Sequence, residues 1–154
     1  ALKGKTPIVT RTTKKITTSM ISAISNRGDT RFMIYEGGLN IKLFLIFLRR
    51  LIKGSTQKIY LIVDNLKVHH AKKVKAWEKK NEKKIRLFYL PPYAPECNPD
   101  EYLNNDLKQK MRRKPTPNTV FELKNSLRAT MRSIQRKPKL VRSYFNHNDV
   151  KYAA

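Results

Sequence analysis

Two short apolar runs stand out in the middle of the chain, and a polar segment containing an acid follows each of them. The first, Ile59–Val63, is unbroken and rich in β-branched and aromatic residues, which predicts a central strand covered on both faces. The second, Ile85–Leu90, predicts another strand. Asp64 directly follows the first run, at the strand end where open α/β sheets place their ligands. A carboxylate in that position needs water, a hydrogen-bond donor or a cation.

Elsewhere, apolar residues recur at helical spacing, and turn-forming residues separate two further strands. The turn at Asn26–Asp29 predicts a hairpin between residues 16–25 and 30–35. The predicted helices span residues 40–51, 71–80, 99–113, 120–134 and 139–145. This order of elements predicts a single α/β domain over residues 1–154, in which 1–15 form an exposed basic arm and 115–154 form C-terminal helices.

The segment after the second run predicts a rigid loop and then the start of a helix. Pro91, Pro92 and Pro95 forbid helix and stiffen the loop. Asn98 is a good N-cap, and Pro99 suits the first helical position, which puts Glu101 at the third. A carboxylate in that first turn lies at the positive end of the helix dipole, and the neighbouring Asp100 is expected to act there too.

The net charge of +23 over 154 residues predicts a polyanionic partner, most simply DNA or RNA. A merely soluble basic surface is the alternative. An anionic membrane is disfavoured, because there is no basic amphipathic anchor and no transmembrane-length apolar run. Cys97 is the single cysteine, which excludes an internal disulfide and fits a reducing compartment such as the cytoplasm. We see no signal peptide and no zinc-type spacing of Cys and His.

One string of residues resembles a known family. The elements that carry the resemblance are the strand ending in Asp64-Asn65, the nearby His69, and the run Leu90-Pro91-Pro92-Tyr93-Ala94-Pro95 leading to Asn98-Pro99-x-Glu101. Together they resemble the catalytic domain of mariner-like transposases, most of all the bacterial and archaeal insertion-sequence branch of the DDE superfamily. Asp64 and Glu101 are 101 − 64 = 37 positions apart, compatible with the span of that family. The resemblance extends back to Gly4-Lys5-Thr6-Pro7 and so covers nearly the whole chain.

This resemblance implies a ribonuclease H-like mixed sheet flanked by helices and an Asp-Asp-Glu/Asp triad that holds two Mg²⁺ or Mn²⁺ ions. It also implies DNA as the partner, both transposon ends and target, and a homodimer in the full-length protein, associated with the nucleoid. One position departs from the family pattern. The first triad Asp of the family lies on a strand upstream of the Gly-x-x-Pro segment, and neither Asp29 nor Glu36 matches it. We therefore expect an N-terminally truncated fold without its first strand and first acid, and no strand cleavage by this chain unaided.

The resemblance assigns Asp64 and Glu101 as the catalytic metal ligands, with carboxylates on the order of 4–8 Å apart, as a two-metal site requires. Two other roles stay open: Asp64 as a strand-end turn residue, and Glu101 as half of a capping box with Asn98. Asn65, His69 and Asn98 are candidates for contacts with substrate or with these acids. Basic residues that flank the two acids are candidates for contacts with DNA phosphates: Lys67, Lys72, Lys73, Lys108, Arg112 and Arg113.

Two functions from different classes fit these observations. One is the catalytic core of a DNA transposase, and the other is a basic DNA- or RNA-binding module without chemistry, including a decayed transposase. Another ribonuclease H-like nuclease, such as a Holliday-junction resolvase, fits the fold but not the Pro-Pro-Tyr motif. The sequence alone leaves open whether this chain is an enzyme. The feature that separates the two functions is a set of acidic side chains that converge on a cation.

Overall fold

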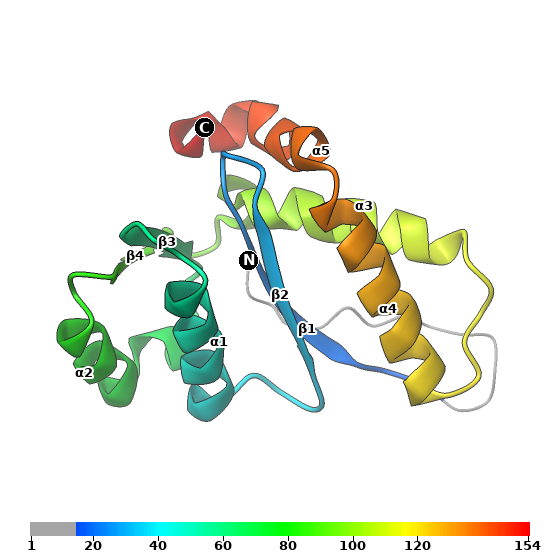
Figure 1. Cartoon of the computed structure of the whole chain (residues 1–154), viewed down its shortest axis with the longest axis horizontal. Helices are drawn as coiled ribbons and strands as arrows, with labels where there is room; N and C mark the ends of the chain where they lie inside the picture. Colours follow the sequence, from blue (N-terminus) through cyan, green and yellow to red (C-terminus); the bar gives the residue numbers. More distant parts are fainter. Residues whose placement is uncertain (1–14) are drawn as a thin grey trace.

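The computed structural model of the chain describes residues 15–154, so the predicted arm over residues 1–15 lies outside it except for the exposed Lys15. Two pairs of strands and the helices around them make up the described part (Figure 1). The strands are β1 (Ser19–Ile24), β2 (Thr30–Tyr35), β3 (Ile59–Val63) and β4 (Ile85–Tyr89). The helices are α1 (Ile41–Lys53), α2 (Lys72–Lys80), α3 (Pro99–Arg112), α4 (Val120–Gln135) and α5 (Pro138–Ser143). Four short 3₁₀ helices lie at Lys67–His70, Pro95–Cys97, Tyr144–Asn146 and Asn148–Ala153.

The strands confirm the predicted α/β class. β1 and β2 form an antiparallel hairpin, whereas β3 and β4 are parallel, and helices flank both pairs. An antiparallel hairpin followed by a helix and a parallel pair is consistent with the ribonuclease H-like fold expected from the sequence. Within the described residues the two pairs are separate two-stranded sheets, with no ladder between β1 and β3.

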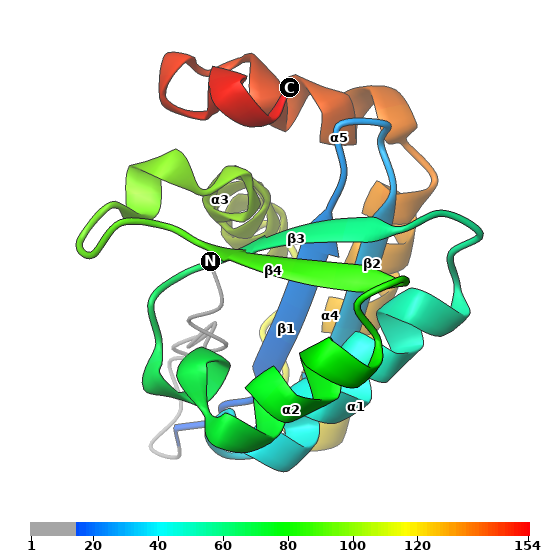
Figure 2. The ribbon, with the colours of Figure 1, turned by 90° about the vertical axis from the view of Figure 1, so that its left-hand side faces the viewer.

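The hairpin is the layer that is covered on both faces. Side chains alternate across a strand, so neighbouring residues enter different cores. Ile21 and Met33 belong to a core built with α1, whereas Met20 belongs to a second core built with α3 and α4. Figures 1 and 2 show these helices on opposite sides of the hairpin.

Only one face of the parallel pair is buried, which differs from the prediction for β3. Helices α1 and α2 pack on a single face of β3 and β4, where Val63, Ile85 and Leu87 are buried (Figure 2). The other face is open: Tyr60 is 64% exposed and Phe88 is 43% exposed. The prediction that Ile59–Val63 is covered on both faces was therefore wrong, because on that side Tyr60 and Ile62 line a cavity and neither joins one of the two apolar cores of residues 15–154.

Local chemistry explains where the elements begin and end. The Asn40 side chain accepts a hydrogen bond from the Leu43 N–H at 2.9 Å and caps α1, and Gly54 ends it. In the hairpin turn, Gly28 has a φ of +97°, which L side chains rarely adopt. A Cβ at this position would also lie only 2.6 Å from the Pro138 carbonyl oxygen, so the turn packs directly against the start of α5. Over residues 15–154, no helix has the length and apolar character that crossing a membrane requires.

Candidate functional site

Asp64 lies just beyond the carboxyl end of β3, and its carboxylate is held by two donors. The Leu66 N–H donates to Asp64 Oδ1 over 3.2 Å. His69 Nδ1 lies 3.0 Å from the same Oδ1 and 3.0 Å from the Asp64 carbonyl oxygen, so a proton on Nδ1 serves both oxygens. These contacts fix the orientation of the carboxylate at the strand end where the sequence predicted it.

His69 reaches Asp64 because the 3₁₀ helix Lys67–His70 folds the chain back toward the strand end. The imidazole is fully buried and packs against the Phe44 ring with 4.6 Å between ring centroids. The Tyr89 hydroxyl donates to the His69 carbonyl oxygen at 3.1 Å, which ties this turn to β4. Among the two roles that the sequence allowed for His69, the structure therefore shows a contact with an acid.

The pKa of the Asp64 carboxyl reflects opposing effects. Burial alone would raise this pKa, but the hydrogen bond and charge of His69 and the Leu66 N–H together lower it below its usual value. The carboxylate is therefore ionised at neutral pH. An oriented, ionised carboxylate at a strand end suits a metal ligand or an acceptor for a substrate proton.

Asn65 belongs to a neighbouring contact rather than to the carboxylate itself. Its side-chain oxygen pairs with His70 Nε2. The His70 ring stacks on Tyr89, with 4.2 Å between centroids and 19° between ring planes. The Asn65–His70 contact thus links the two ends of the turn that follows Asp64, and the stacking on Tyr89 ties this turn to β4.

Helix α3 begins as the sequence predicted. The Asn98 side-chain oxygen accepts a hydrogen bond from the Asp100 N–H at 3.0 Å, Pro99 is the first helical residue, and Glu101 is the third. The Asn98 N–H donates to the Pro95 carbonyl oxygen at 3.0 Å, so this N–H is not committed to a capping box with Glu101. The buried Asn98 Nδ2 has no hydrogen-bond partner in the described structure. Glu101 itself is partly exposed.

Asp100 is the residue that sequence reasoning misjudged. Its carboxylate is buried, 5% exposed, and the Ser22 hydroxyl lies 2.9 and 2.8 Å from its two oxygens. Burial raises the pKa of Asp100 to about 6, against the smaller opposing effect of the Ser22 hydrogen bond. No local signal points to Ser22, which precedes Asp100 by 78 positions and lies on β1.

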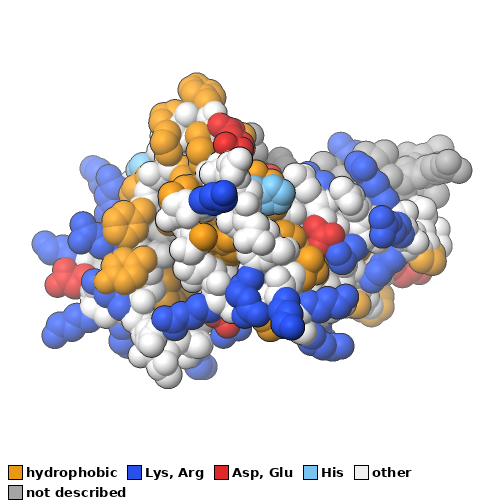
Figure 3. Space-filling view, turned by 90° about the horizontal axis from the view of Figure 1, so that it is seen from above, with side chains coloured by type: hydrophobic (Ala, Val, Ile, Leu, Met, Phe, Trp, Pro, Cys, Tyr) orange, Lys and Arg blue, Asp and Glu red, His pale blue; other side chains and the backbone are white. Residues whose placement is uncertain are grey.

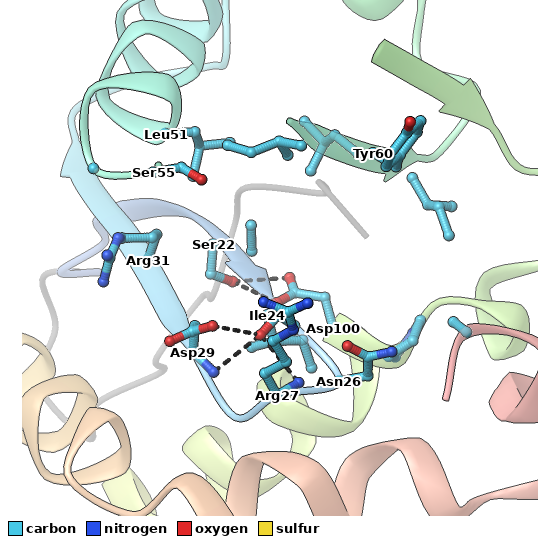
Figure 4. Close-up of a pocket in the computed structure, with 18 of the residues that line it drawn as sticks. Ser22, Ile24, Asn26, Arg27, Asp29, Arg31, Leu51, Ser55, Tyr60 and Asp100 are labelled. Carbon is cyan, nitrogen blue, oxygen red and sulfur yellow. Dashed lines mark hydrogen bonds between the residues drawn. The ribbon is translucent and has the colours of Figure 1, made fainter. Parts of the chain in front are cut away.

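The Ser22–Asp100 contact lies at the edge of a cavity of about 620 Å³ (Figure 4). The end of the hairpin, the carboxyl end of α1, β3 and the start of α3 enclose this space. Asn98 and Asp100 line it, whereas Asp64 and Glu101 do not. The cavity is therefore distinct from the two acids that the sequence singled out.

Asp64 and Glu101 stand at the two ends of the segment that runs from β3 to α3. The hydrogen bonds of the Asp64 carboxylate go to Leu66 and His69, and the predicted 4–8 Å approach of the two carboxylates stays a prediction. In the part of the chain that the structure describes, no three His, Cys, Asp or Glu side chains gather into a group that could hold a metal ion.

The candidate DNA-binding residues lie at the surface on three helices: the 3₁₀ helix Lys67–His70 and α2 follow Asp64, and α3 with its C-cap residue Arg113 carries the others. All but Lys108, which is partly exposed, are exposed. Among residues 15–154 none of the six takes part in an ion pair; the lysines that do are Lys110 with Asp106 and Lys124 with Glu36. Their charges are therefore available to phosphate groups.

Comparison with known proteins adds one finding. The sequence model of a family described as DDE superfamily endonuclease matches residues 1–124 of this chain. This match includes the hairpin, both strands of the parallel pair, and all of α3. No curated protein matches the chain.

Proposed function

The chain belongs to the DDE superfamily endonucleases, and from this we propose that it is the catalytic core of a mariner-like, insertion-sequence DNA transposase. Such a core cuts DNA strands at the ends of a transposon and joins them to target DNA. The observation that carries the proposal is the ionised Asp64 carboxylate, which His69 and the Leu66 N–H orient at the end of β3. The proposal also implies a homodimer in the full-length protein and a location with the chromosomal DNA.

The donor chemistry of the two acids suits Mg²⁺ or Mn²⁺, because carboxylate oxygens are the hard ligands that these ions prefer. Two carboxylates alone do not complete a two-ion site, and residues 15–154 supply no third ligand to such a group. Water and substrate phosphate would have to provide the remaining coordination. We therefore expect weak occupancy in the absence of DNA.

In the proposed site, Asp64 and Glu101 hold the metal ions. Bound ions would activate an oxygen nucleophile and neutralise charge on the phosphate under attack. His69 positions the Asp64 carboxylate, Asn98 starts α3 and so places Glu101, and Asn65 supports the turn through His70. Basic residues bind the DNA backbone on either side of the acids: Lys67, Lys72, Lys73, Lys108, Arg112 and Arg113.

The test is Mn²⁺ binding by the chain with a DNA duplex present, followed by electron paramagnetic resonance. We expect Asp64→Asn and Glu101→Gln each to weaken Mn²⁺ binding by at least about tenfold. Glu82→Gln is the matched control, since it removes an exposed carboxylate that precedes β4 and should leave binding unchanged. Unchanged Mn²⁺ affinity in Asp64→Asn would overturn the proposal.

A second candidate function is a basic nucleic-acid-binding module without chemistry. The charge of +23, carried largely by exposed Lys and Arg, is the observation that favours it. The same titration separates the two candidates. The module would be favoured if DNA bound equally tightly in Mn²⁺ and in EDTA, and if Asp64→Asn and Glu101→Gln left Mn²⁺ binding unchanged.

A further inference from the structure

The open face of β3 and β4 carries two large aromatic rings in a basic setting. Tyr60 and Phe88 are 64% and 43% exposed, and their ring centroids lie 6.2 Å apart with 34° between the planes. Both side chains come from the face opposite the core formed with α1 and α2. The strand register explains the arrangement, because Tyr60 pairs with Arg86 and Ile62 pairs with Phe88 on adjacent parallel strands.

A cation accompanies each ring. Lys58 Nζ lies 5.6 Å from the Tyr60 ring centroid, and Arg86 Cζ lies 5.5 Å from the Phe88 ring centroid. Such cation–π contacts hold the charges at the edge of the aromatic face. Figure 3, which looks down on the molecule of Figure 1, shows exposed hydrophobic side chains among many Lys and Arg side chains.

A basic groove adjoins this face. Five cations line it: Lys58, Lys75, Lys79, Lys83 and Arg86. Two glutamates line the same groove, and one of them, Glu78, accepts a hydrogen bond from the Leu87 N–H at 2.8 Å. Counting charges, five basic and two acidic side chains leave a surplus of three positive charges beside the rings.

We propose that the open face of β3 and β4, with Tyr60 and Phe88 as stacking rings and Lys58 and Arg86 as phosphate contacts, binds unpaired nucleotides of a DNA strand. Bases stack on exposed aromatic rings, and the phosphates that link them follow neighbouring cations. A duplex hides the faces of its bases within its own stack, so this surface selects single strands. A protein partner would have to bury the surplus of positive charge, which is costly without paired acids.

The binding site is distinct from the proposed catalytic acids. Tyr60 precedes Asp64 by four residues, which is about 13 Å along an extended strand. The inference goes beyond the proposed function and does not depend on metal binding or cleavage.

The experiment measures binding of a fluorescently labelled 12-nucleotide oligo-dT, and of a 12-base-pair duplex, to the full chain by anisotropy. Loss of one stacking ring costs about 1–3 kcal/mol per base, so Tyr60→Ala and Phe88→Ala should each weaken oligo-dT binding about 5- to 150-fold. Duplex affinity should change by less than about twofold. Tyr60→Phe and Phe88→Tyr keep a ring and should retain single-strand affinity.

Phe121→Ala is the matched control, because Phe121 is 73% exposed on α4 and lies outside the proposed site. Fluorescence of a 2-aminopurine base in the oligonucleotide adds a direct readout, since stacking on a ring quenches it. Equal loss of oligo-dT and duplex affinity in Tyr60→Ala would overturn the inference. So would concentration-dependent dimerisation that Tyr60→Ala abolishes, since the face would then be an interface between two copies. The oligo-dT titrations are run in EDTA, without metal ions, so this test and the Mn²⁺ test can fail separately.

Discussion

At the scale of single residues, two carboxylates of this chain occupy opposite electrostatic settings. Asp64 is partly exposed and receives two donors, so its pKa is lowered and the charged form is favoured. Asp100 is buried and receives the Ser22 hydroxyl, which does not offset the loss of hydration, so its pKa rises to about 6. The first setting suits a group that acts as an anion, and the second makes a group that is costly to ionise.

Asp100 should therefore make the stability of the protein depend on pH. The folded pKa of Asp100, about 6, exceeds the unfolded value of 3.8, so the folded protein binds this proton more tightly than the unfolded chain does. The resulting contribution to the free energy of unfolding is fully present below pH 3.8 and is lost as pH rises through about 6. Asp100→Asn should flatten this dependence and raise the free energy of unfolding near pH 7 by on the order of 3 kcal/mol, since (6 − 3.8) × 1.36 is about 3. Urea unfolding of both proteins at pH 4, 5, 6 and 7 measures the difference.

Glu82→Gln, at an exposed carboxylate, is the control and should leave the pH profile nearly unchanged. If Asp100→Asn instead changed the free energy of unfolding by the same amount at every pH, the pKa of Asp100 would be the same in the folded and unfolded protein, which would contradict this prediction.

At the scale of elements, the hairpin and α5 depend on each other through one glycine. The turn between β1 and β2 requires a positive φ at Gly28, and the backbone of Pro138, the first residue of α5, fills the space beside its Cα. The Arg142 guanidinium also donates to the Arg27 carbonyl oxygen at 3.3 Å. The end of the hairpin thereby locates the C-terminal helices, although more than one hundred positions separate the two in sequence.

Gly28→Ala should destabilise the protein by about 1–2 kcal/mol from the left-handed backbone alone. The clash with Pro138 adds to this cost, because a Cβ would lie 2.6 Å from its carbonyl oxygen. Thermal unfolding followed by circular dichroism measures the loss. Gly38→Ala is the matched control: among the described residues, no neighbouring atom lies within 4 Å of a Cβ built at this position, and its φ is not positive, so its unfolding temperature should stay close to that of the parent. A Gly28→Ala protein as stable as Gly38→Ala would contradict the packing described here.

At the scale of the whole molecule, a two-core body carries a large excess of positive charge. One core joins α1, α2 and the parallel pair to the hairpin, and the other joins α3, α4 and α5 to its opposite face. Because no Lys or Arg side chain of residues 15–154 is buried in the cores, most of the charge of +23 lies at the surface. A body of this kind attracts DNA through its phosphates, whatever the sequence.

Duplex DNA binding should therefore weaken steeply with salt, with a log–log slope of about −0.9 for each phosphate contact. The double variant Lys72→Ala/Lys73→Ala should make the slope shallower by roughly 2 and weaken binding to all sequences alike. Anisotropy titrations between 50 and 300 mM KCl, values on the order of physiological ionic strength, give the slope. Lys137→Ala/Lys139→Ala removes the same charge beside α5 and should change the slope less. If the two double variants changed the salt slope equally, DNA would not bind preferentially at α2, and the prediction would be wrong.

The sequence by itself determined the local structure of this protein and the motif that places it in its family. Periodicity and capping residues are local properties, because a side chain three positions away decides whether a helix starts. Asn98 accordingly marks the start of α3 where it was predicted. The strand ending at Asp64 and the helix that carries Glu101 followed from the same kind of reasoning.

Only the tertiary structure decided which strands are covered and what surrounds each acid. An apolar run shows that a strand has two apolar faces, but the burial of those faces depends on which helices pack on them. In this protein helices pack on both faces of the hairpin and on only one face of β3. The Ser22–Asp100 contact joins residues that are 78 positions apart, and no pattern in the chain marks either partner. His69 also reached Asp64 through a turn whose path depends on packing against Phe44. Contacts between distant segments set hydration and charge at a side chain, and these determine its pKa.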